Sequence, residues 1–138
     1  MIKKMFFILL LCLGFQILSA QDKTSEINFI LNKAHNGIEK TNVSLFSDYL
    51  NSRVYISLSD GTKGYFSANQ SYYIIQDFLI GINPIKVSFE TASEESENPV
   101  AFGDIEYVSS GKKNKLKLFI SMEFFHDKWR ITHISMTK

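Results

Sequence analysis

The chain has 138 residues, of which 45% are hydrophobic and 21% are charged, and its formal net charge is +1. This length suits a single domain built around one hydrophobic core. The near-neutral charge gives no general electrostatic reason to expect nucleic acid or an anionic membrane as a partner.

The first twenty residues have the layout of a secretory signal peptide. Lys3 and Lys4 form a positively charged start, residues 5–18 are almost all apolar, and the small residue Ala20 stands before the polar Gln21, as signal peptidase prefers. We therefore expect residues 1–20 to be removed by cleavage near Ala20-Gln21, which leaves a single domain over residues 21–138. The protein is then expected in the periplasm or outside the cell, without stable membrane insertion.

Two alternatives for this segment are weaker. A retained membrane anchor needs about 20 apolar residues to cross a bilayer, more than the stretch 5–18 provides. Lipid modification would require Cys12, but the bulky Leu11 stands directly before it, where a small residue is expected. Cleavage removes Cys12, Lys3 and Lys4, so the mature chain has no thiol chemistry and 13 basic against 14 acidic residues.

Helices are predicted for the first part of the mature chain. Apolar residues recur at three- and four-residue steps within 24–40, the period of one helical face, and these residues are Ile27, Ile30, Leu31, Ala34 and Ile38. A second, shorter helix is predicted over 42–50, with Val43 and Phe46 on its inner side. His35 lies between polar neighbours on the first helix, without a second metal ligand one turn away, so we expect a solvated surface histidine.

The pattern then changes to the alternation typical of strands. Residues 54–59 alternate between apolar and polar side chains, Asp60-Gly61 is a turn signal, and 63–66 can fold back as a short second strand. Ser67 and Gln70 form a capping box that starts a third helix. Asn83-Pro84 ends this helix, because proline disfavours helical geometry in the residue before it.

From residue 85 onward every segment is predicted as strand, over 85–91, 100–110, 115–125 and 129–136. A turn that contains Gly111 joins the second and third of these strands, and His126, Asp127 and Lys128 form the turn before the last. Trp129, Ile131 and His133 are expected to share one face of the last strand. The order of helix, helix, two strands, helix and four antiparallel strands indicates an α+β fold.

This order resembles that of the nuclear transport factor 2-like superfamily. The closing stretch DKWRITHI, residues 127–134, is similar to the charged turn and Trp-x-Ile pattern that ends many members. More narrowly, residues 43–70 and 124–136 resemble the domain of unknown function 4783 family, small exported proteins of Bacteroidetes. The resemblance implies N-terminal helices packed on a strongly curved antiparallel sheet, a cone-like and cystatin-like α+β topology, with dimerisation through the sheet. It brings no established activity.

Enzymes of this superfamily, such as ketosteroid isomerase, place an acid, a base or a tyrosine inside the cone, where burial can shift its pKa. The carboxylates considered for such a role are Asp48, Asp77, Asp104, Glu106 and Glu123. None forms an evident pair with a histidine, and the sequence has no metal-ligand, nucleophile or phosphate-loop motif. We therefore name no catalytic residue, metal or cofactor. A small lyase, isomerase or hydrolase that uses a buried carboxylate or histidine is the alternative function.

The aromatic residues favour a binding role. The chain has 12 phenylalanines and 6 tyrosines, and Phe119, Phe125 and Tyr55 fall on the outward side of their predicted strands. Exposed apolar patches often mark contact or ligand sites. We therefore expect a non-enzymatic module with a cone-shaped pocket that binds a small apolar ligand or a protein partner, including a second copy of the chain. The candidate pocket or interface residues are Tyr55, Phe119, Trp129 and His133.

Overall fold

The computed structural model describes residues 22–92 and 98–138. The predicted signal peptide, residues 1–20, lies outside this part of the chain, and so does Gln21. Among the described residues, no helix has both the length and the apolar composition needed to cross a membrane.

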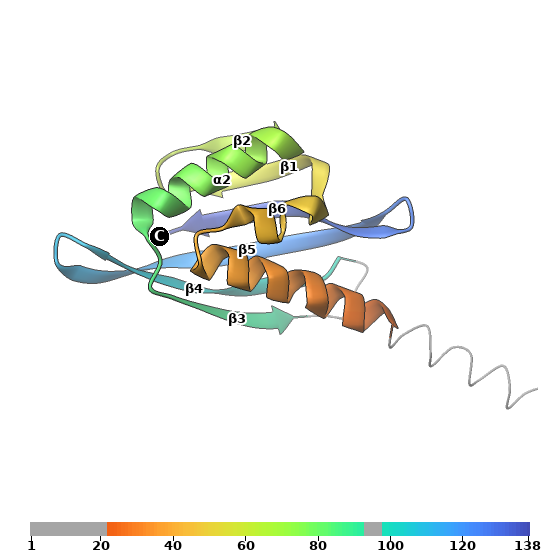
Figure 1. Ribbon diagram of the computed structural model, residues 1–138, viewed down its shortest axis with the longest axis horizontal. Helices are drawn as coiled ribbons and strands as arrows, with labels where there is room; N and C mark the ends of the chain where they lie inside the picture. The colour runs from red at the N-terminus through yellow and green to blue at the C-terminus, as the bar shows by residue number, and fades with distance from the viewer. Residues whose placement is uncertain (1–21, 93–97) are drawn as a thin grey trace, which may run out of the picture.

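The elements follow the predicted order, except that two 3-10 turns replace the predicted second helix (Figure 1). A long N-terminal helix covers residues 22–39, and two 3-10 turns, η1 (Val43–Leu45) and η2 (Ser47–Tyr49), lead into strand β1 (Leu50–Leu58). Strand β2 (Lys63–Ser67) and helix α2 (Ala68–Ile82) come next. The remaining strands are β3 (Lys86–Ala92), β4 (Val100–Ser109), β5 (Lys112–Phe125) and β6 (Lys128–Thr137).

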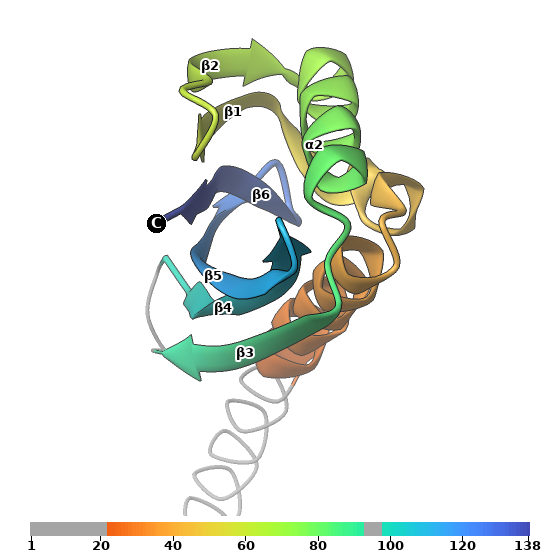
Figure 2. The same ribbon diagram turned by 90° about the vertical axis from the view of Figure 1, so that its left-hand side faces the viewer.

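The strands form one six-stranded sheet in the order β2-β1-β6-β5-β4-β3. Strands β3 to β6 are antiparallel neighbours, as predicted, but β1 pairs with β6 in parallel, so the sheet is mixed. Figure 2 shows that the sheet curls and that both helices lie on the same face of it. We call the face turned away from the helices the outer face.

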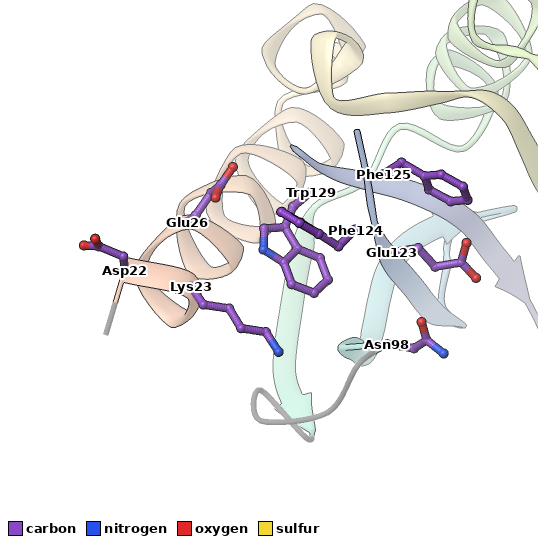
Figure 3. Close-up of a pocket in the computed structure, with 8 residues that line it drawn as sticks. All are labelled: Asp22, Lys23, Glu26, Asn98, Glu123, Phe124, Phe125 and Trp129. Atoms are coloured by element: carbon purple, nitrogen blue, oxygen red, sulfur yellow. The ribbon is translucent and has the colours of Figure 1, made fainter. Parts of the chain in front are cut away.

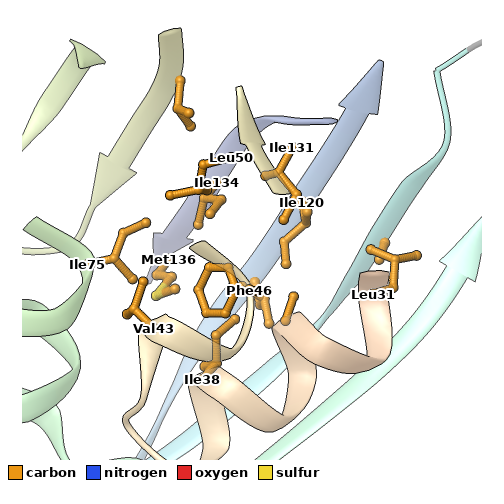
Figure 4. Packing of buried hydrophobic residues seen from close by; sticks show 14 of the residues in the cluster. Leu31, Ile38, Val43, Phe46, Leu50, Ile75, Ile120, Ile131, Ile134 and Met136 are labelled. Carbon is orange, nitrogen blue, oxygen red and sulfur yellow. The ribbon is translucent and has the colours of Figure 1, made fainter. Parts of the chain in front are cut away.

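The core fills the space between the helices and the sheet (Figure 4). All five apolar residues predicted for the inner face of the N-terminal helix are at most 3% exposed, which confirms that prediction. They pack with Phe46, and with strand residues such as Ile120, Ile131 and Met136. Among the described residues, Ser71 is the sole buried polar side chain, and its hydroxyl has no hydrogen-bond partner.

The predicted second α-helix is wrong, because the structure has the two 3-10 turns there instead. The segment is held by side chains from outside it: the Gln76 amide on α2 accepts from the Val43 N–H at 3.0 Å and donates to the Thr41 carbonyl at 2.8 Å. Asn42 caps the first turn by accepting from the Ser44 N–H. These bonds satisfy backbone groups that a longer helix would pair internally.

His35 is not a solvated surface residue, contrary to the prediction. Its Nε2 lies 2.9 Å from the carbonyl oxygen of Val87 on the edge strand β3, and its ring meets Phe89 edge-on with centroids 5.3 Å apart. His35 therefore links the N-terminal helix to the edge strand β3 and gives the Val87 carbonyl a hydrogen-bond partner.

The predicted ends of α2 and the last hairpin are confirmed. Ser67 and Gln70 form both halves of a capping box, and Asn83 ends the helix in the left-handed conformation. Between β5 and β6, His126 and Asp127 both have positive φ, 48° and 63°. Such a pair is typical of a tight two-residue hairpin turn, so the polar residues of this stretch form a turn at the end of the sheet.

Candidate functional site

An aromatic band crosses the outer face of the sheet. It consists of one residue from each of five adjacent strands: Tyr65, Tyr55, His133, Phe119 and Phe102, on β2, β1, β6, β5 and β4. The ring centroids of neighbours are 5.0 Å apart for Tyr65 and Tyr55, 4.9 Å for Tyr55 and His133, and 4.9 Å for His133 and Phe119. Three of the four predicted site residues, Tyr55, Phe119 and His133, therefore lie in contact.

Two breaks in strand register meet beside this band. Residues 51–54 of β1 lie opposite the single residue Thr132 of β6, between the pairs Leu50–Ile131 and Tyr55–His133. On the other side of β6, Ile131 and His133 pair with consecutive residues of β5, so Thr132 between them is an extra, bulged residue there as well. Bulges of this kind bend a strand and redirect its side chains. Residues of both breaks line a hollow in the outer face, which we call the outer groove.

The bulge at Thr132 also separates Trp129 from His133, so the prediction that they share a face is wrong. Trp129 and Ile131 point to the helices before the bulge, and Ile134 and Met136 do so after it, because the extra residue shifts the alternation by one. Trp129 is only 5% exposed and belongs to the core. His133 is turned to the outer face, where it contacts Tyr55 and Phe119.

The outer groove has a volume of about 680 Å³, within the range usual for ligand sites. Its lining side chains are Asn51, Arg53, Tyr55, Tyr65, Ser121, Glu123, Thr132 and His133. The Arg53 guanidinium lies over the Tyr65 ring, 4.5 Å from its centroid, a favourable cation–π geometry. Asn51 donates to the Arg53 carbonyl at 3.3 Å, and the Thr132 hydroxyl lies 3.4 Å from the Ser121 carbonyl.

Most of these lining residues were missed by the sequence analysis. Arg53, Tyr65, Asn51 and Thr132 are polar or exposed residues that no motif distinguishes. One signal was available: the apolar positions of the last strand fall on 129 and 131 and then on 134 and 136, a change of phase that marks a bulge between them.

Burial lowers the pKa of His133 below its usual value of 6.5, because a partly enclosed imidazolium loses hydration. Tyr55 and Phe119 pack against the ring, and the charged groups that share the groove with it are Arg53 and Glu123. The neutral imidazole is therefore the form that the folded protein favours at neutral pH.

We expect a pH dependence of stability from this residue. Because the folded protein binds the His133 proton less tightly than the unfolded chain does, the free energy of unfolding should fall as pH drops from 6.5 through the lowered pKa. Above pH 6.5 this contribution is complete. Urea unfolding of the wild type and of His133→Gln, measured from pH 7.5 to 5, should show the wild-type free energy of unfolding falling relative to that of the variant as the pH drops. Parallel curves would contradict this expectation.

A second hollow, of about 630 Å³, lies at the start of the N-terminal helix, beside the tip of the β5–β6 hairpin (Figure 3). Figure 3 shows the rings of Trp129 and Phe124 next to each other there, with centroids 5.3 Å apart. The Lys23 ammonium lies 5.2 Å from the centroid of the Trp129 ring. Since Trp129 is almost completely covered, it serves mainly as packing beneath this hollow.

The carboxylates considered as catalytic acids or bases lie outside the core. Asp48 and Asp77 are exposed, while Asp104, Glu106 and Glu123 are partly exposed on β4 and β5. Asp104 accepts a hydrogen bond from the Lys117 ammonium at 2.8 Å, which lowers the pKa of this carboxyl. Within 22–92 and 98–138, no group of three or more possible metal ligands comes together.

Comparison with known proteins places this geometry in a family. Residues 31–137 match the family model described as "Domain of unknown function (DUF4783)". A crystal structure of a DUF4783 family protein from Bacteroides ovatus superposes with a TM-score of 0.66 at 10% identity, covering 77% of this chain and 92% of that one. A DUF4783 family protein from Bacteroides uniformis gives a TM-score of 0.63 at 14% identity, covering 78% and 94%.

Similarity of fold extends beyond this family. An NTF2-like protein of unknown function from Shewanella oneidensis superposes with a TM-score of 0.58 at 10% identity, covering 83% of this chain and 98% of that one. A domain of unknown function with a cystatin-like fold from Nostoc punctiforme gives 0.61 at 11% identity, covering 82% and 75%. At these identities the likeness concerns the fold alone. No curated protein matches the chain.

Proposed function

Because this chain belongs to the DUF4783 family and has the nuclear transport factor 2-like fold, we propose that it is a non-enzymatic binding module and that the outer groove is its ligand site. The family carries no known activity, so the proposal rests on the chemistry of the site. A ligand site on the outer face differs from the pocket inside the cone that was expected from the sequence.

The filling of the interior supports an outer site. The space between helices and sheet is occupied by apolar side chains such as Phe46, Ile75 and Met136, each completely buried (Figure 4). Catalysis inside the cone, the alternative function, would use a buried carboxylate or histidine. Among the described residues the buried polar set consists of Ser71 alone.

The observation that carries the proposal is the coincidence of the double register break with the aromatic band. Interrupting the hydrogen-bonded ladder in the middle of a sheet costs stability, since backbone groups lose their partners there. Exposing Tyr65 beside the break leaves apolar area in water as well. Features of this kind concentrate at functional sites, where bulges redirect side chains toward a ligand.

The proposal is tested by native mass spectrometry of the protein purified, without refolding, from the cells that naturally produce it. We expect a non-covalent small-molecule adduct that is lost in Tyr65→Ala and retained in Tyr73→Ala. Tyr73 is a matched control because it is similarly exposed, 59% against 62% for Tyr65, and lies on α2 away from the groove. A bare chain in every sample, or an adduct that survives Tyr65→Ala, would contradict the proposal.

A second copy of the chain is the competing occupant of the outer face, and Phe119→Glu separates the two cases. Phe119 is partly exposed in the middle of the aromatic band, so a glutamate there would place a charge in any interface on this face. We expect light scattering to give the mass of one chain for both wild type and variant. Ile80→Glu, on the exposed side of α2, is the control. A wild-type dimer that Phe119→Glu alone dissociates would assign the face to self-association.

We also propose that the module acts outside the cytoplasm after removal of residues 1–20. The charged start, apolar stretch and small residue at 20 support this. Mass spectrometry of the exported protein should find a chain that begins at Gln21, with or without cyclisation to pyroglutamate. Recovery of the intact N-terminus in a membrane fraction would overturn the assignment.

A further inference from the structure

The charges that line the outer groove cancel. Arg53 carries a positive charge and Glu123 a negative one, and His133 is held in its neutral form at neutral pH. An anionic ligand is usually bound by an excess of cationic groups and a cationic ligand by an excess of carboxylates. A groove without net charge has no such preference and suits an uncharged ligand.

The hydrogen-bonding groups of the groove further restrict the chemical class of the ligand. Six of its eight lining side chains can both donate and accept: Asn51, Tyr55, Tyr65, Ser121, Thr132 and His133. A phosphate or carboxylate only accepts hydrogen bonds, and an ammonium only donates them. A hydroxyl does both, so a set of groups with this double capacity matches a ligand that carries many hydroxyls.

The aromatic rings supply the remaining part of the site. Tyr65 is 62% exposed and projects beside Tyr55, with Arg53 against its ring. The face of an aromatic ring has negative electrostatic character and attracts the weakly positive C–H groups of a saturated ring. A pyranose has such a C–H face together with hydroxyls around its edge, which is the combination that the groove can contact.

Building on the proposed function, we propose that the outer groove binds a neutral oligosaccharide. Tyr65 and Tyr55 contact the C–H face of a sugar ring, while Asn51, Ser121, Thr132 and the neutral imidazole of His133 exchange hydrogen bonds with its hydroxyls. The groove crosses β2, β1, β6 and β5, so it can accommodate more than one sugar ring along its length.

The test is isothermal titration of the protein with a panel of neutral hexasaccharides: glucose units joined by β-1,4, β-1,3 or α-1,4 bonds, β-1,4-mannose and β-1,4-N-acetylglucosamine. We expect at least one to bind with a Kd below about 1 mM. Tyr65→Ala should weaken that binding about tenfold or more, and Tyr73→Ala should leave it unchanged. Raising salt from 50 to 500 mM should change the affinity less than about twofold, because an uncharged ligand is not screened.

Three results would overturn this inference: no neutral hexasaccharide of the panel binds with a Kd below about 1 mM, binding is equally strong in Tyr65→Ala, or a galacturonate hexasaccharide binds more tightly than every neutral one. The proposed function is tested separately, by the adduct that native mass spectrometry is expected to detect. An adduct that Tyr65→Ala removes, together with failure of every neutral sugar, would retain the groove as a ligand site and reject the sugar.

Discussion

Replacing Gly103 by alanine is expected to destabilise the protein by about 3–5 kcal/mol, the upper range for a single substitution. A Cβ built on Gly103 would lie 1.7 Å from the carbonyl oxygen of Ser88 and 2.7 Å from its carbonyl carbon. Both are main-chain atoms of β3, so no side-chain rotation can relieve the overlap. Strand β3 would have to move away from β4. This movement would draw Val87 out of the core and break the contact of His35 with the Val87 carbonyl.

Urea unfolding followed by circular dichroism measures this effect, and Gly81→Ala is the matched control. A Cβ on Gly81 would meet no atom within 4 Å, and Gly81 lies in α2, where alanine favours the helix by up to about 1 kcal/mol. The two glycine-to-alanine changes should therefore move the unfolding midpoint in opposite directions. An unchanged midpoint for Gly103→Ala would mean that β3 does not approach β4 as closely as described.

The parts of the fold that depend on local chemistry could be predicted from the sequence. Helix α2 begins at the capping box of Ser67 and Gln70 and ends at Asn83, because each of these residues acts on backbone groups within one turn of itself. The inner face of the N-terminal helix was predicted for a similar reason: a period of three to four residues specifies one side of a helix regardless of what packs against it.

Features that depend on distant segments could not be predicted. The parallel pairing of β1 with β6 joins residues about eighty positions apart, and the bond of His35 to Val87 spans 52. Neither contact changes the local pattern of apolar and polar residues, so the sequence gives no sign of it. Gly103 gives a further example, since a glycine within a strand can mark a bulge or a close approach, but only the register shows that Ser88 and Phe89 lie against it.

The candidate site likewise contains residues that the local pattern predicted correctly and one that it did not. Tyr55 and Phe119 were placed on the outward side of their strands by simple alternation, and the structure has them there. His133 was placed with Trp129 because alternation was extended through Thr132, where β6 bulges. One extra residue was enough to move the histidine from the face of Trp129 and Ile131 to the aromatic band.

Trp129→Ala is expected to cost about 3–5 kcal/mol, the range for truncating a buried large aromatic residue. The indole is 5% exposed, packs against Phe124 and is approached by the Lys23 ammonium. Removing it would leave a cavity where the N-terminal helix meets the last hairpin. Because the whole domain is expected to have about 5–15 kcal/mol of stability, this loss should lower the urea midpoint substantially.

His126→Ala provides the comparison within the same hairpin. His126 is exposed in the turn, so its side chain contributes little packing, and the cost should stay below about 1 kcal/mol. That cost arises because alanine tolerates the positive φ of this position less well than histidine does. A large loss for His126→Ala with a small one for Trp129→Ala would contradict the hairpin geometry. It would mean that the histidine, rather than the tryptophan, organises this end of the sheet.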